Sequence, residues 1–222
     1  MSRHTRNPSA DERRRAAERA GDPVAVLRER LRRGEVTTEQ VRVAAVLGDA
    51  RAWALEPPTD PTDLNLALGR EGSIYLVGRA LGDRDGLAAS YAADCAERVT
   101  SVWVQRHGND ALLRSAIEAA RRWVRERSAD AANEARRAVR AVLASDLLVS
   151  SDRVYYAARA AAYAGEAAYV RNTDVAAANA ANTAVNARIP SPGDSSAAEV
   201  RAEVHWQQDR LIAYVLREER PL

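Results

Sequence analysis

Hydrophobic positions recur every three or four residues along most of the chain, and this spacing predicts amphipathic α-helices rather than strands. Alanine fills many of these positions, so the predicted helices are thin and can approach one another closely. We therefore expect an all-α protein, a compact antiparallel bundle of alanine-rich helices with a small N-terminal helical module. Residues 74–81 have strand propensity, but their neighbours favour a buried helix.

The positions of proline, glycine and charged residues divide the chain into four parts. Residues 1–21 are rich in arginine and offer little to bury, so we expect a mobile tail. Residues 22–56 are predicted to form a short helical module, and the proline-containing residues 57–70 a linker. The bundle is expected over 71–218, ending in a helix over 197–218.

Capping residues predict where individual helices begin and end. Asp22 followed by Pro23 is typical of a helix start, and Gly34 and Gly48 are typical of helix ends. Trp53 is predicted to anchor one further short helix. Capping boxes are predicted at Ser9 and Glu12, at Thr37 and Gln40, and at Ser196 and Glu199.

Each bundle helix has one apolar face that should point into the core. In a helix predicted from about Asp83, an unbroken i, i+4 ladder runs through Leu87, Tyr91, Cys95, Val99 and Trp103. The sequence His107-Gly108-Asn109 should end this helix, and further helices are predicted over 152–170 and 172–186. The other predicted core positions are Leu113, Ile117, Ala120, Val124, Ala132, Ala135, Val139, Val142, Val200, Val204, Leu211 and Val215.

The composition narrows the possible functions. All 33 basic residues are arginine and 31 residues are acidic, so the net charge of +2 argues against a protein that works mainly by charge. One cysteine and three histidines exclude a disulfide framework and a conventional Cys/His zinc site. No run of eighteen apolar residues occurs and the first residues are charged, so we expect neither a membrane-spanning helix nor a signal peptide. We expect a cytoplasmic protein without a cofactor or metal.

The candidate catalytic residues have simpler structural explanations. Cys95 lies on the apolar ladder and is predicted to be a core thiol. His107 is predicted to meet the dipole at a helix end. Asp94 and Glu97 are one turn apart, but Asp94 is also placed to pair with Arg98 on the solvent side. Because no nucleophile, base and orienting group come together, we predict that the chain is not an enzyme.

Residues 111–145 contain eight arginines and four acidic residues, which raises the question of nucleic-acid binding. Acids are interleaved with the arginines, so a solvated helix face is the better interpretation than a duplex-binding one. A nucleic-acid-associated regulator is the weakest of the binding hypotheses.

An uncharged polar stripe is the least expected feature. Asn179, Asn182 and Asn186 follow one another at helical spacing in an otherwise alanine-rich helix, with Thr183 beside them. Asparagine is a poor helix former, so such a stripe needs a reason. It either hydrogen-bonds between helices or forms an exposed recognition strip, next to the tyrosines of the preceding helix.

Four stretches together resemble a known family. They are DCAERV at 94–99, AIEAARRW at 116–123, AARAA at 157–161 and WQQDRL at 206–211. In this order and spacing they resemble the immunity proteins of bacterial polymorphic-toxin systems over roughly residues 87–217. The resemblance implies an all-helical protein that binds a cognate protein toxin and blocks it in the producing cell. It supplies no catalytic residues.

The leading hypothesis is therefore a toxin-neutralising protein that acts by stoichiometric protein–protein binding. The alternative is a helical scaffold that forms homo-oligomers by burying its Asn and Tyr faces against itself. Binding energy in such interfaces comes from a few aromatic, arginine and polar anchors. The candidate anchors are Tyr156, Arg159, Tyr163, Asn179, Asn182, Asn186 and Trp206.

Overall fold

The structure is a computed structural model that describes residues 9–59, 81, 86–145, 153–189 and 197–218. Within these ranges every regular element is an α-helix and no strand occurs, which confirms the predicted all-α class. None of the described helices combines the length and apolarity that crossing a bilayer requires. The predictions for 74–80, for residues 60–70 of the linker and for the Ser196 cap lie outside the described residues.

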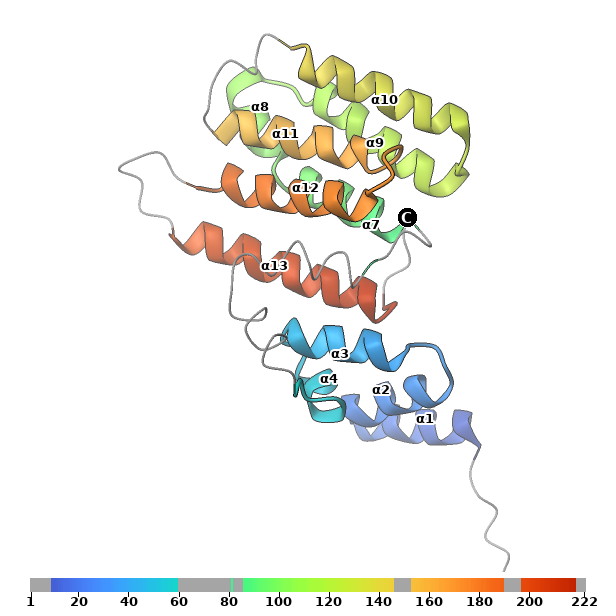
Figure 1. Cartoon of the computed structure of the whole chain (residues 1–222). Coiled ribbons are helices and arrows are strands. Elements are labelled where there is room, and N and C mark those ends of the chain that lie inside the picture. The colour runs from blue at the N-terminus through green and yellow to red at the C-terminus, as the bar shows by residue number, and fades with distance from the viewer. Residues whose placement is uncertain (1–8, 60–80, 82–85, 146–152, 190–196, 219–222) are drawn as a thin grey trace, which may run out of the picture.

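The helices form an N-terminal module, a bundle and a helix between them (Figure 1). The module consists of α1 (Ala10–Ala20), α2 (Pro23–Arg32), α3 (Thr38–Val46) and α4 (Ala50–Leu55). The bundle consists of α7 (Leu87–Arg98), α8 (Thr100–His107), α9 (Ala111–Glu126), α10 (Ala129–Leu143), α11 (Arg153–Glu166) and α12 (Thr173–Ala187). The last helix, α13 (Ala197–Val215), contacts both parts.

The predicted caps of the module are present. The Asp22 carboxylate accepts hydrogen bonds from two backbone amides at the start of α2, where Pro23 is the first residue. Both halves of the capping boxes at Ser9 and at Thr37 are formed. Trp53 is not the anchor of α4, because 45% of it is exposed and the neighbouring Ala52 is buried instead.

Helix α1 occupies part of the segment for which the sequence predicts a mobile tail. Its Ala17 is buried, and Arg13 forms an ion pair of 3.2 Å with Glu29 of α2. Glu29 is itself buried, so it gives the arginine-rich helix a fixed partner. The composition of residues 10–20 alone does not reveal this contact.

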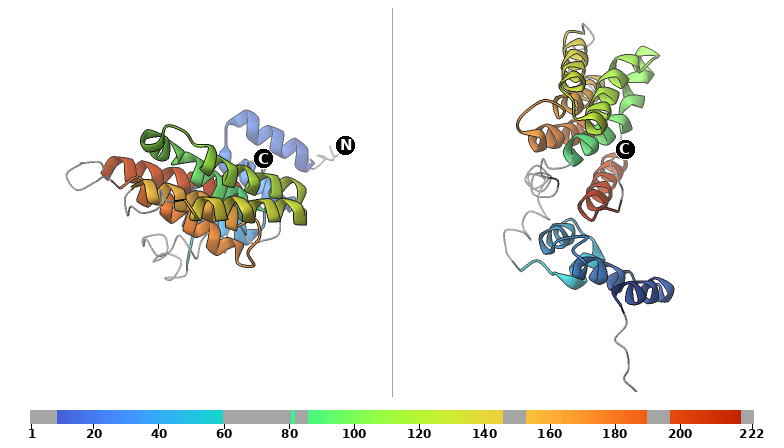
Figure 2. Two further views of the ribbon diagram at one scale, coloured as in Figure 1. Left: turned by 90° about the horizontal axis from the view of Figure 1, so that it is seen from above. Right: turned by 90° about the vertical axis from the view of Figure 1, so that its right-hand side faces the viewer.

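The module attaches to the rest of the protein through α13. Helix α3 packs against α13, and Arg51 forms an ion pair of 2.7 Å with Glu218, just beyond that helix. Arg30 also donates a hydrogen bond to the carbonyl oxygen of Leu216. The right-hand view of Figure 2 shows the module and the bundle on opposite sides of α13.

Helix α7 is the centre of the bundle. Every residue from Ala88 to Ala96 is buried, as expected for a helix surrounded by other helices. It contacts α8, α9, α11, α12 and α13. The predicted ladder from Tyr91 to Trp103 is buried, but the helix is not continuous. The chain leaves helical geometry at Val99, where the Thr100 hydroxyl donates a hydrogen bond to the Glu97 carbonyl.

The remaining core faces largely follow the hydrophobic pattern, except on α13. Leu113, Ile117 and Ala120 are buried as predicted, but Val204 is 37% exposed. The buried positions of α13 include instead Glu203, which is 1% exposed. Acidic residues are seldom buried unless they are paired, so the hydrophobic pattern alone points to the wrong face in the first half of this helix.

Candidate protein-binding site

The two helices that contain most of the predicted anchors form an antiparallel hairpin. Helices α11 and α12 are joined by a short turn and pack against each other along their lengths. Alanine residues on both helices face inward and are buried. Figure 2 shows this hairpin along one side of the bundle, and none of the described helices covers its outer surface.

The outward stripes of this hairpin bring six of the seven predicted anchors together. Helix α11 contributes Tyr156, Arg159 and Tyr163, which are three and four residues apart. Helix α12 contributes Asn179, Asn182 and Asn186, and all six side chains are half-buried. Because the helices are antiparallel, Tyr163 lies toward the Asn179 end and Tyr156 toward the Asn186 end. We call these six residues the hairpin face.

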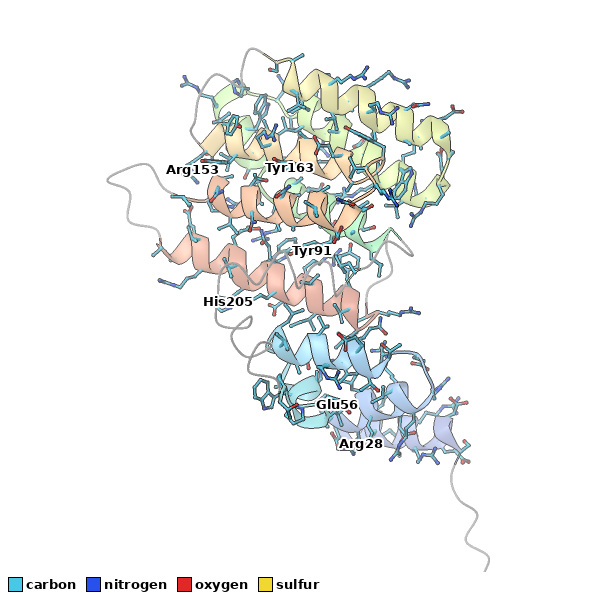
Figure 3. All side chains as sticks on the ribbon, in the orientation of Figure 1. Arg28, Glu56, Tyr91, Arg153, Tyr163 and His205 are labelled. Atoms are coloured by element: carbon cyan, nitrogen blue, oxygen red, sulfur yellow. The ribbon has the colours of Figure 1, made fainter. Side chains whose placement is uncertain are left out.

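The arginine and one tyrosine of the hairpin face hold each other in position. The Arg159 Nη2 donates a hydrogen bond of 2.6 Å to the Tyr163 hydroxyl. The guanidinium also lies 4.6 Å from the centre of the Tyr163 ring, within range of a cation–π contact. Figure 3 shows Tyr163 on α11. The flexible arginine side chain is thus held against the more rigid tyrosine ring before any partner binds.

The asparagine stripe is neither fully buried nor fully exposed. Thr183 does not contribute its hydroxyl to the surface, because it donates within the helix to the carbonyls of Asn179 and Ala180 at 2.7 and 3.1 Å. The side chains of Asn179 and Asn186 make no hydrogen bond to any residue that the structure describes. Their amides are therefore available to an external partner.

A shallow depression of about 270 Å³ adjoins the hairpin face at the turn between α11 and α12. Asn179 lines it, together with Glu166 and the apolar side chains of Val170 and Val175. Val175 is 43% exposed, which is unusual for a large aliphatic residue in this helix. Periodicity alone does not single out these three neighbours. Glu166 does have one signal in the sequence, because it is an acid at the end of a helix, where a basic residue is favoured.

Trp206, the seventh predicted anchor, lies elsewhere. It is half-buried on α13, and the guanidinium of Arg98 on α7 lies 4.3 Å from its ring centre. Arg98 also binds Glu203 at 3.0 Å. These contacts place Trp206 in the attachment of α13 to α7, away from the outward stripes of α11 and α12.

Asp94 is not the solvent-facing residue that the sequence predicts. It is 8% exposed and pairs with Arg121 of α9 and Arg210 of α13, at 3.1 and 2.6 Å, instead of with Arg98. The Tyr214 hydroxyl donates a further hydrogen bond of 2.7 Å. Glu97 is ion-paired with Arg121 as well. Both carboxylates are thus occupied in holding helices together.

The single thiol has the predicted core role. Cys95 is fully buried on α7, and burial raises its pKa well above the ordinary value of 9.0. A thiol of this kind is protonated and unreactive at neutral pH. Tyr91 lies one turn earlier on α7 (Figure 3). It packs edge-on against Tyr214 of α13, with ring centres 6.3 Å apart.

Neither histidine of the described residues belongs to a reactive group. His107 ends α8 and stacks against Trp103, with ring centres 4.2 Å apart. His205 lies exposed on α13 (Figure 3). Across the parts of the chain that the structure describes, no three His, Cys, Asp or Glu side chains gather as a metal site would require.

Several arginines of the basic helix pair are engaged in ion pairs. Arg122 binds Glu126 and Glu134 at 2.8 and 2.5 Å, and Arg114 binds Asp110. Arg121 is bound to Asp94 and Glu97. These contacts favour the interpretation as a solvated face over a continuous phosphate-binding surface.

One comparison with known proteins gives a match. A family model described as "Imm-5 like putative immunity protein" matches residues 84–214, which span α7 to nearly the end of α13. No curated protein and no solved structure matches the chain. The matched residues contain the entire hairpin face, whereas the module α1–α4 lies outside the match.

Proposed function

Because the chain belongs to the Imm-5 like immunity protein family, we propose that it neutralises a protein toxin by binding it stoichiometrically. The observation that supports this most directly is the hairpin face, which presents Tyr, Arg and Asn side chains within the family-matched region. Such side chains are typical of protein-binding surfaces.

The hairpin face suits tight binding because part of it is ordered before a partner arrives. Arg159 and Tyr163 restrain each other through a hydrogen bond and a ring contact. Ordering a flexible side chain on binding costs about 0.5–1.5 kcal/mol, so prior order saves part of this cost. The amides of Asn179 and Asn186 can then donate to and accept from the backbone of a toxin.

Inhibition by this route is steric. A rigid helix pair covers the toxin's active surface and requires neither a cofactor nor turnover. Asp94 and Glu97, one helical turn apart, are the candidate pair for acid–base catalysis. Both are ion-paired with Arg121, which supports a structural role for them and a binding function for the protein. The site of action would be the cytoplasm of the cell that makes the toxin.

Co-expression tests the proposal. The first step is to identify a toxin-like reading frame adjacent to this gene, and its product is then expressed with and without the chain. We expect growth to be restored and the two proteins to co-purify as a one-to-one complex by light scattering. A chain that never protects, or that is a stable closed homo-oligomer with the hairpin face buried, would contradict the proposal.

A further inference from the structure

The depression at the α11–α12 turn contains a half-buried acid without an ion pair. Glu166 is the last residue of α11, and it forms no ion pair or side-chain hydrogen bond with any residue that the structure describes. Most other carboxylates with low exposure do have such partners, as Asp94, Glu29 and Glu203 illustrate. Glu166 therefore differs from the buried acids that stabilise the fold.

The position of Glu166 is electrostatically unfavourable in the free protein. The C-terminal end of a helix has a partial negative charge, which favours a nearby cation and disfavours a carboxylate. Helices α8, α9 and α10 have a basic residue in the last turn, whereas α11, like α12 and α13, has none to compensate the charge of its terminal acid. Burial raises the pKa of Glu166, and Arg159 offsets this only in part.

The lining of the depression is apolar around this acid. Val170 and Val175 provide aliphatic surface, and the Asn179 side chain adds an amide oxygen that can accept a hydrogen bond. An aliphatic stem that ends in a cation complements this combination. Arg159 acts on Glu166 from within α11, and Arg171, which is exposed, also lines the depression. Asp174 lies in the first turn of α12 and is not part of the lining.

We propose that the depression binds the side chain of a basic residue of the toxin, with its cation paired to Glu166 and its methylene stem on Val170 and Val175. This inference rests on the proposed function, and it identifies where one anchor of the toxin inserts. The occupant is part of a protein because the depression is continuous with the hairpin face through Asn179. An acidic side chain would lie against Glu166 and is disfavoured.

The Glu166→Gln variant tests this, because it keeps the shape and removes the charge. The matched control is Glu118→Gln on α9, an exposed acid remote from the hairpin. In calorimetric titrations with the neighbouring toxin, we expect Glu166→Gln to weaken binding at least about tenfold, as for a lost charge-assisted hydrogen bond. Glu118→Gln should stay within about twofold of the unmodified chain.

A second measurement separates failure of this inference from failure of the proposed function. N-acetyl-L-arginine amide is titrated into the full chain while the NMR signals of the Asn179 side chain are followed. We expect saturable shifts that Glu166→Gln abolishes and that N-acetyl-L-aspartate amide does not produce.

Three outcomes overturn the inference. The first is toxin binding that Glu166→Gln leaves unchanged, in which case the proposed function still stands. The second is an arginine probe that shifts Asn179 equally, or not at all, in both proteins. The third is a preference for the acidic probe. If the toxin binds no form of the chain, the proposed function fails and the probe titration alone decides whether the depression takes a basic side chain.

Discussion

The carboxylate of Asp94 on α7 accepts a hydrogen bond of 2.7 Å from the phenolic hydroxyl of Tyr214 on α13. The same oxygen accepts a bond of 2.8 Å from the Arg210 Nε, and the other oxygen pairs with Arg121 of α9. One buried carboxylate thus joins three helices. Burial raises the pKa of Tyr214, and the negative charge of Asp94 and the hydrogen bond to it raise the pKa further.

Replacing Asp94 with asparagine should destabilise the bundle. The amide keeps the shape but leaves the two arginines without their shared charge, and breaking a buried pair costs about 3–5 kcal/mol. We expect a loss of about 3 kcal/mol in the free energy of unfolding by urea. The control Asp209→Asn, at an exposed position of α13, should change it by less than about 0.5 kcal/mol. Equal stability of both variants would show that the Asp94 network contributes nothing.

Gly165→Ala should also destabilise the protein, through overpacking. A Cβ at Gly165 on α11 would lie 2.5 Å from the Val139 Cγ2 of α10. Overpacking a close contact costs about 1–3 kcal/mol, which exceeds the gain of about 0.5–1 kcal/mol in helix propensity. In a Val139→Ala background the same substitution should cost less, because the clashing methyl group is absent. Measuring the same cost in both backgrounds would rule out this contact as the cause.

The helix caps and the buried Glu203 show why the fold class could be predicted from the sequence and why individual contacts could not. Helical spacing and caps are local, and Ser9, Asp22 and Thr37 cap helices as the sequence predicts. Glu203 can be buried because it pairs with Arg98 and accepts a hydrogen bond from Gln207. Arg98 lies on α7, far away in the sequence, and Gln207 is a polar residue one turn later on α13. A hydrophobic pattern treats such an acid as exposed, so it placed Val204 in the core instead.

In the candidate site, too, the sequence predicts the local arrangement of residues along a helix but not the contacts between helices. Sequence spacing put Tyr156, Arg159 and Tyr163 on one stripe, and the hairpin brought them beside the asparagines. Trp206 was grouped with them by residue type, but its contact with Arg98 is set by the packing of α13 on α7. The depression at Glu166 could not be predicted, because it is formed by the turn between α11 and α12. The conformation of a turn does not follow from the spacing of hydrophobic residues.

Cys95 should be protected from thiol reagents in the folded protein. Burial excludes the reagent and raises the pKa of the thiol, so little thiolate is present at neutral pH. We expect iodoacetamide to label Cys95 only as fast as the protein opens, and quickly in about 8 M urea. Rapid labelling under native conditions, at the rate of a small free thiol, would contradict the buried position on α7.

Glu166 should make stability depend on pH. Its pKa in the folded protein is raised above the ordinary 4.5, so the folded state holds this proton more tightly than the unfolded chain. The stabilisation by the protonated form is fully present below 4.5 and is lost as the pH rises through the folded-state pKa. Relative to the unmodified protein, Glu166→Gln should therefore gain stability between about pH 4 and pH 7 in urea unfolding. A stability difference that is constant with pH, or a loss at pH 7, would be inconsistent with an unfavourable carboxylate.

The proposed function requires that the hairpin face of α11 and α12 binds a protein toxin. Isothermal titration of the toxin encoded beside this gene tests it most directly, using the double variant Arg159→Ala/Asn179→Ala. The control is Arg137→Ala, an exposed arginine on α10, and circular dichroism checks that both variants fold. We predict one toxin per unmodified chain, a loss of about a hundredfold or more in affinity for the double variant, and near-unchanged binding for the control. Unchanged affinity of the double variant, or a larger loss for Arg137→Ala, would contradict the claim.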